Sequence, residues 1–164
     1  MDRIAEIPRR QAALAFAGAV AVLLLDQGSK ALVRHALPLY EPREVIPGFF
    51  ALRHCLNDGA AWSILSGSRW LLVGVSAVAL AALVACRRDV LRLGRSLGSW
   101  IFALLGGGIA GNLVDRVWTG RVVDFLDFTF GTYHYPTFNV ADSAICIGVL
   151  LYLLASFLPR NRRR

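Results

Sequence analysis

The sequence predicts an all-α membrane protein with four transmembrane helices and a small β-containing extracytoplasmic cap. Of its 164 residues 56% are hydrophobic and the mean hydropathy is +0.54, which is too apolar for a soluble domain of this size. Four apolar stretches, at residues 11–33, 68–86, 97–118 and 139–158, approach or exceed the ~17–25 residues that cross a bilayer. We therefore treat residues 1–164 as a single membrane domain.

The distribution of basic residues predicts the orientation of these helices. Of the 18 Lys and Arg residues, eleven lie before the first stretch, between the second and third, or after the fourth. Four spans place those three regions on one side of the membrane, and the positive-inside rule identifies it as the cytoplasm. Both termini are then cytoplasmic, whereas the cap at 36–68 and the outer segment at 119–138 face outward. Because the basic clusters serve orientation, we expect no nucleic-acid partner.

The first stretch contains two opposite charges, Asp26 and Lys30, four residues apart. This spacing places them on one helical face, where pairing lowers the cost of each charge near the bilayer. Two interpretations follow from the residues alone. The pair is a structural ion pair that fixes the register of the helix, or one of its members lines a polar cleft together with Asp115.

The outward segment at 36–68 has the composition of a small folded cap. Pro38, Pro42, Pro47 and Gly48 interrupt any helix, and the β-branched and aromatic residues of 45–52 suit short strands. We predict one or two hairpins here. The run from 57 to 63, NDGAAWS, begins with a turn signal and leads into the second apolar stretch.

The third stretch carries polar residues that require protein or water around them. Gly108, Asn112 and Asp115 follow one another at four- and three-residue steps and share a helical face. Gly107 and Gly111 form a small-residue surface for a close neighbouring helix. Beyond this helix, the segment 119–138 is rich in apolar and aromatic residues, and we expect it to lie along or dip into the membrane interface.

Three aspartates fall near the outer membrane face in this topology: Asp115, Asp124 and Asp142. Two carboxylates in a partly desolvated cleft share one proton, so that one serves as base and the other as acid, as in aspartic peptidases. Spacing alone leaves the pair undetermined, and the alternative is that the carboxylates form ion pairs with Arg116 and Arg121. The three Cys and three His residues are scattered, so we expect neither a metal nor a cofactor.

Five runs in this order resemble the signature blocks of bacterial lipoprotein signal peptidase, also called signal peptidase II. They are 26–30 (DQGSK), 57–63 (NDGAAWS), 107–116 (GGIAGNLVDR), 122–125 (VVDF) and 138–142 (FNVAD). The resemblance implies that Asp124 and Asp142 are the catalytic pair. It implies that the following residues support the site and the substrate: Asp26, Lys30, Asn57, Gly59, Gly108, Asn112, Asp115, Arg116, Asn139 and Ala141.

The resemblance also implies an activity and a location. The expected protein is an aspartic endopeptidase of the bacterial inner membrane that removes the signal peptide from diacylglyceryl-modified prolipoproteins, cutting just before the lipidated Cys. Its expected partners are that lipid-modified prolipoprotein, membrane lipid and a globomycin-type inhibitor. Two other classes remain open from the residues: a proton-coupled carrier with a relay of Asp26, Lys30, Asp115 and Arg116, and a non-catalytic scaffold.

Overall fold

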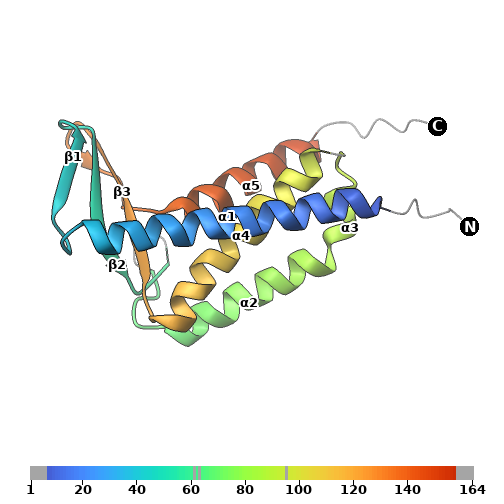
Figure 1. Cartoon of the computed structure of the whole chain (residues 1–164), viewed down its shortest axis with the longest axis horizontal. Helices are drawn as coiled ribbons and strands as arrows, with labels where there is room; N and C mark the ends of the chain where they lie inside the picture. Colours follow the sequence, from blue (N-terminus) through green and yellow to red (C-terminus); the bar gives the residue numbers. More distant parts are fainter. Residues whose placement is uncertain (1–6, 61, 63, 95, 158–164) are drawn as a thin grey trace, which may run out of the picture.

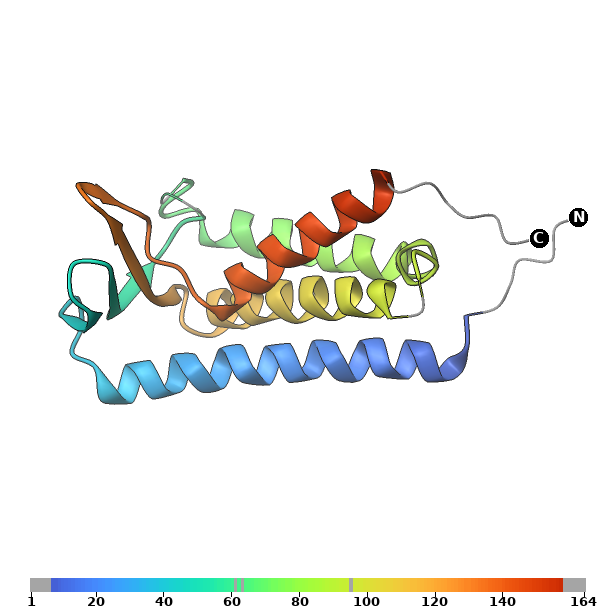
Figure 2. The same ribbon diagram turned by 90° about the horizontal axis from the view of Figure 1, so that it is seen from above.

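The computed structural model describes residues 7–60, 62, 64–94 and 96–157, and it has a helical bundle with a small sheet at one end (Figure 1). The helices are α1 (Arg9–Ala36), α2 (Arg69–Ala85), the short α3 (Arg87–Leu91), α4 (Leu97–Trp118) and α5 (Val140–Phe157). The strands are β1 (Pro42–Ile46), β2 (Phe50–Asn57), β3 (Val122–Phe130) and β4 (Tyr133–His134). Helix α1 begins and α5 ends at the end of the bundle opposite the sheet (Figure 2).

Within the described residues, α1, α4 and α5 are long and apolar enough to cross a membrane. Helix α2 is equally apolar but has 17 residues. At 1.5 Å per residue it spans about 25 Å, slightly less than a hydrocarbon core of about 30 Å. The bundle therefore contains three helices of spanning length and a shorter apolar one.

Helix α4 lies at the centre of the bundle and packs against α1, α2 and α5. Its glycines make these contacts close. A Cβ atom on Gly107 would lie 2.6 Å from Val22 Cβ on α1, and one on Gly108 would lie 2.6 Å from the Ala141 carbonyl oxygen on α5. A Cβ atom on Gly111 would lie 2.5 Å from Asp26 Oδ2 on α1, so the predicted surface of Gly107 and Gly111 is confirmed as a close contact with α1.

The sheet is antiparallel with the strand order β1-β2-β3-β4. The predicted hairpin in 36–68 is confirmed as β1 and β2. The outer segment 119–138 contains two strands, which the prediction of an interfacial segment missed, so the description as all-α is corrected to mostly helical with a sheet. Strand β3 is paired on both sides and its Val122, Val123 and Phe125 are buried. The apolar density that suggested the interface therefore reflects burial within protein.

A small apolar core joins the sheet to the bundle. Val33 and Leu37 of α1 pack against Val123 and Phe125 of β3. This contact holds β3 beside the C-terminal end of α1, where Asp124 lies next to the start of α5.

Candidate active site

Asp124 lies on β3 and is 3% exposed. Its Oδ1 accepts a hydrogen bond of 2.7 Å from Asn139 Nδ2, and its Oδ2 accepts one of 2.9 Å from Asn57 Nδ2. Burial, followed by the nearby Asp142 carboxylate, raises the pKa of Asp124 to about 7, although the two amide donors act in the opposite direction. The side chain therefore exchanges a proton near neutral pH.

Asp142 lies in the first turn of α5, where it forms a reciprocal cap with Asn139. Asn139 Oδ1 accepts a hydrogen bond of 2.9 Å from Asp142 N, and Asp142 Oδ2 accepts one of 3.1 Å from Asn139 N. The other oxygen, Asp142 Oδ1, accepts a bond of 2.7 Å from Asn112 Nδ2 on α4. Since the Asn139 side chain also donates to Asp124, both carboxylates converge on Asn139.

Lys30 forms a buried charge cluster directly behind these carboxylates. Its side chain is 0% exposed, and Nζ lies 2.8 Å from Asp26 Oδ2, 2.9 Å from Asp115 Oδ2 and 2.9 Å from Asn112 Oδ1. The predicted Asp26–Lys30 pair is confirmed, and the same ammonium group also contacts Asp115. Among the described residues, the ion pairs of Asp115 are with Lys30 and, at 4.0 Å, with Arg34. Pairing with the adjacent Arg116 is not observed.

Asn112 connects the charge cluster to the carboxylate pair. Its Oδ1 accepts bonds from Lys30 Nζ at 2.9 Å and Asn139 Nδ2 at 3.2 Å, while its Nδ2 donates to Asp142. Asp26 Oδ1 accepts a bond of 2.9 Å from the backbone N–H of Ala141 at the start of α5. The ion pairs between α1 and α4 therefore also fix the position of α5.

The loop after β2 closes the site from the cap. Gly59 N donates to Asn57 Oδ1 at 2.9 Å, and Arg116 Nη2 on α4 donates to the Gly59 carbonyl at 3.0 Å. The loop is thereby held against α4 while Asn57 reaches Asp124. Residues 61 and 63 of the predicted run lie outside the described residues.

The structure brings all twelve predicted site residues to one end of the bundle. Eleven take part in the hydrogen bonds and ion pairs above, and Gly108 contributes by letting α5 approach α4. Sequence reasoning missed Gln27, whose Nε2 donates to Asp26, to the Gly111 carbonyl and to Asp115 at 3.1–3.3 Å. Its position inside the DQGSK run is the signal that could have found it.

Cys55 lies directly opposite Asp124 in the β2–β3 ladder, but it is unsuited to nucleophilic catalysis. Burial raises the pKa of its thiol, so the reactive thiolate is scarce at neutral pH. Within the described part of the chain, no group of three or more His, Cys, Asp or Glu side chains is arranged to hold a metal ion. Two neighbouring carboxylates held by amides are groups of the type that perform acid–base catalysis.

Comparison with known proteins decides the family. The family described as signal peptidase (SPase) II matches residues 18–158. This chain belongs to the signal peptidase II family. It is therefore a membrane protease of the signal peptidase II type, and family membership decides against the carrier and scaffold alternatives.

Individual members of the signal peptidase II family match along most of the chain. The lipoprotein signal peptidases of Geobacter metallireducens, Bacillus pumilus and Klebsiella aerogenes are 44%, 40% and 41% identical to it. These alignments cover 87%, 89% and 88% of this chain and 88%, 94% and 89% of the relatives.

Solved structures agree with this assignment. A bacterial membrane enzyme solved at 2.3 Å is 34% identical with a TM-score of 0.80, over 92% of this chain and 91% of that one. Another, solved at 1.9 Å, is 35% identical with a TM-score of 0.76, over 87% of this chain and 92% of that one. The chain thus has a membrane enzyme fold and is a multi-pass membrane protein.

Proposed function

We propose that this protein removes the signal peptide from diacylglyceryl-modified prolipoproteins by cutting just before the lipidated Cys, with Asp124 and Asp142 as its catalytic pair. The observation that carries the proposal is the convergence of these two carboxylates on Asn139. Both receive hydrogen bonds from amides, and neither has a Lys or Arg ion-pair partner within 4 Å among the described residues. Such a pair reduces its negative charge by retaining a proton.

In the proposed mechanism the ionised carboxylate accepts a proton from a water molecule that attacks the scissile carbonyl carbon. The protonated carboxyl donates its proton to the carbonyl oxygen, and a proton later passes to the leaving amine as the C–N bond breaks. Asn57, Asn112 and Asn139 hold the two carboxylates during these transfers because each donates to at least one of them. Lys30 and Asp115 hold Asn112 and the start of β3 in turn.

The proposed orientation places four spans, α1, α2, α4 and α5, in the bacterial inner membrane, with both termini in the cytoplasm and the site at the outer face. Support comes from the fold: the basic residues Arg9, Arg10, Arg87 and Arg88 lie at the bundle end away from the sheet (Figures 1 and 2). Large apolar side chains such as Leu24, Leu32 and Leu150 are exposed on the bundle, where membrane lipid would cover them. All 164 residues form one membrane domain in this proposal.

Cleavage of a diacylglyceryl-modified precursor, beside its unlipidated form, tests the function. Native protein should cleave only the lipidated form, and a globomycin-type inhibitor should block the reaction. We expect Asp124→Asn and Asp142→Asn each to lower the rate by about 10³-fold, while Asp89→Asn, at an exposed position on α3, stays at the native rate. Unchanged cleavage by either site variant would remove that residue from the pair.

Thiol labelling tests the orientation independently of activity. Cys86 is exposed at the end of α2, so a membrane-impermeant maleimide applied from outside intact spheroplasts should not label it. Thr132→Cys in a Cys86→Ser background, in the β3–β4 turn, should be labelled under the same conditions. The reverse pattern would show that the sheet faces the cytoplasm.

A further inference from the structure

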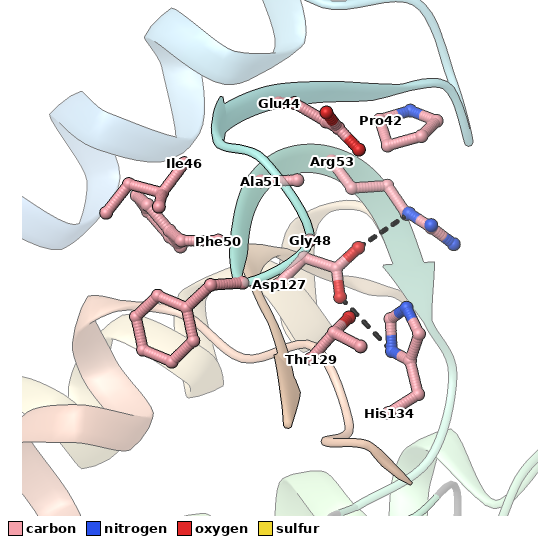
Figure 3. A pocket seen from close by; sticks show the side chains of 11 residues that line it. Pro42, Glu44, Ile46, Gly48, Phe50, Ala51, Arg53, Asp127, Thr129 and His134 are labelled. Atoms are coloured by element: carbon pink, nitrogen blue, oxygen red, sulfur yellow. Dashed lines mark ion pairs between the residues drawn. The ribbon is translucent and has the colours of Figure 1, made fainter. Parts of the chain in front are cut away.

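A second buried carboxylate on β3 has no part in the proposed mechanism. Asp127 is 3% exposed and lines a cavity of about 130 Å³ on the sheet (Figure 3). Its Oδ2 lies 2.8 Å from Arg53 Nε, and its Oδ1 lies 3.3 Å from His134 Nδ1. Glu44 and Ala51 line the same cavity, but Glu44 forms no ion pair among the described residues.

The partners of Asp127 lie on the strands that serve Asp124. Arg53 is on β2, four residues before Asn57, and Asp127 is on β3, three residues after Asp124. The Arg53–Asp127 ion pair therefore joins the same two strands as the Asn57–Asp124 hydrogen bond of 2.9 Å, a short distance along the ladder. The two contacts lie on opposite faces of the sheet because side chains alternate along a strand and 124 and 127 differ by an odd number.

An irregularity in β2 separates these two contacts. Leu52 pairs with Leu126, but Cys55 pairs with Asp124, so β2 uses three steps where β3 uses two. One extra residue inverts the faces of all residues that follow it. In an unbroken ladder Asn57 would lie on the opposite face from Asp124. The extra residue is what lets Arg53 face Asp127 and Asn57 face Asp124.

We propose that the Arg53–Asp127 ion pair is a positioning device that holds this bulge in register, so that Asn57 reaches Asp124. The proposal rests on the proposed function of Asp124. The β1 ladder ends at the Pro42–Arg53 pair, so it does not fix residues 55–57 of β2, and without the ion pair the bulge can move toward Asn57. Arg53 and Asp127 act through Asn57 and do not touch the reacting atoms.

Loss of the Asn57 hydrogen bond has a distinct effect on the titration of Asp124. That bond stabilises the ionised carboxylate, so its loss raises the pKa of Asp124 further above its ordinary range. The groups outside β2 that act on Asp124, which are Asp142, Asn139, Lys30 and Arg116, stay in place, and Cys55 moves with the register of β2. The alkaline limb of the activity profile should then move to higher pH.

The test compares Arg53→Gln with three variants: Arg53→Lys, which keeps the charge, Glu44→Gln, which changes a carboxylate of the same cavity, and Asn57→Ala. We expect Arg53→Gln to lower kcat about 10-fold with KM nearly unchanged, because the change displaces a group at the reacting carboxylate. Arg53→Lys should recover most of this loss, and Glu44→Gln should match the native protein.

The double variant decides whether Arg53 acts through Asn57. If it does, Arg53→Gln in an Asn57→Ala background should change kcat by less than about 2-fold. The proton concentration at the midpoint of the alkaline limb should likewise change by less than about 2-fold. An equal loss in both backgrounds, or a native profile for Arg53→Gln, would overturn the proposal.

A crystal structure of the Arg53→Gln variant provides a readout that does not depend on activity. We expect the register between 52 and 57 to change and the Asn57–Asp124 bond to be lost. An unaltered bond would overturn the positioning role. Failure of the native protein to cleave the lipidated precursor would instead contradict the proposed function, while this structural comparison would still decide the role of Arg53.

Discussion

Replacing Lys30 by Met should cause the largest loss of stability at any charged position in the bundle. Lys30 is the only lysine in the sequence, and its fully buried Nζ lies within 2.9 Å of two carboxylates and one amide oxygen. Methionine has a similar length and no charge, so the variant keeps most of the packing. It leaves the Asp26 and Asp115 carboxylates buried, and among the described residues the partly exposed Arg34 is then the one cation within 4 Å of them.

The expected magnitude follows from the burial of these groups. Removing one partner from a buried ion pair costs about 3–5 kcal/mol, because the remaining charge stays out of water without compensation. For a chain of this length, about 2–4 °C of Tm accompany each kcal/mol, so we expect Tm to fall by about 6–20 °C. Arg34→Met removes the other cation near Asp115, but Arg34 is 37% exposed and 4.0 Å away, and its loss should cost less than about 1 kcal/mol.

Thermal unfolding in detergent micelles measures both variants. Combining Lys30→Met with Asp26→Asn and Asp115→Asn should recover part of the lost stability, because it removes the uncompensated charges. Equal Tm values for Lys30→Met and the native protein would refute the view that this cluster supports the bundle. A triple variant less stable than Lys30→Met would refute the role of uncompensated charge.

Two further predictions concern α4 and the carboxylate pair. Gly111→Ala should destabilise the protein by about 1–3 kcal/mol, because the new Cβ would lie 2.5 Å from Asp26 Oδ2. The control Gly28→Ala, whose new Cβ would have no atom within 4 Å, should be neutral or stabilising. Equal unfolding temperatures for the two variants would contradict this prediction. Because the pKa of Asp124 is raised to about 7, kcat/KM should fall as pH rises through 7 and the pair loses its remaining proton. The folded state binds this proton more tightly than the unfolded state, so the free energy of unfolding should also decrease as the pH rises from about 4 to 7. An activity profile that stays flat to about pH 9 would contradict the assignment of Asp124.

The lengths of the apolar stretches predicted the helices of the bundle, and the spacing of charged residues predicted one of its ion pairs. An Asp and a Lys four residues apart on a helix lie on one face, so the pairing of Asp26 with Lys30 followed from the sequence. The partner of Asp115 did not follow from the sequence. Its neighbour Arg116 was the candidate, but adjacent helical residues point in directions about 100° apart. Asp115 and Arg116 accordingly reach different neighbours, Lys30 and the Gly59 carbonyl.

The strands of the outer segment 119–138 and the bulge in β2 were harder to predict. The run of β3 has aspartates at 124 and 127, and this odd spacing breaks the alternation by which a half-buried strand is recognised. The structure gives the reason: each face of β3 buries one carboxylate, one near the helices and one near Arg53. The bulge in β2 could not be predicted either, because its position depends on the pairing of segments about 70 residues apart.

The four aspartates of the site differ in the partners that surround them, and in the proposed function this difference separates structural from chemical roles. Asp26 and Asp115 each contact the Lys30 ammonium, whose positive charge compensates theirs in an apolar bundle. Asp124 and Asp142 receive hydrogen bonds from Asn57, Asn112 and Asn139, and neutral amides orient a carboxylate without cancelling its charge. In the proposed mechanism a proton shared between Asp124 and Asp142 provides this compensation. The proposed function therefore depends on where the cation lies: Lys30 pairs with Asp26 and Asp115, and the pair without such a cation is the one that exchanges a proton with the substrate.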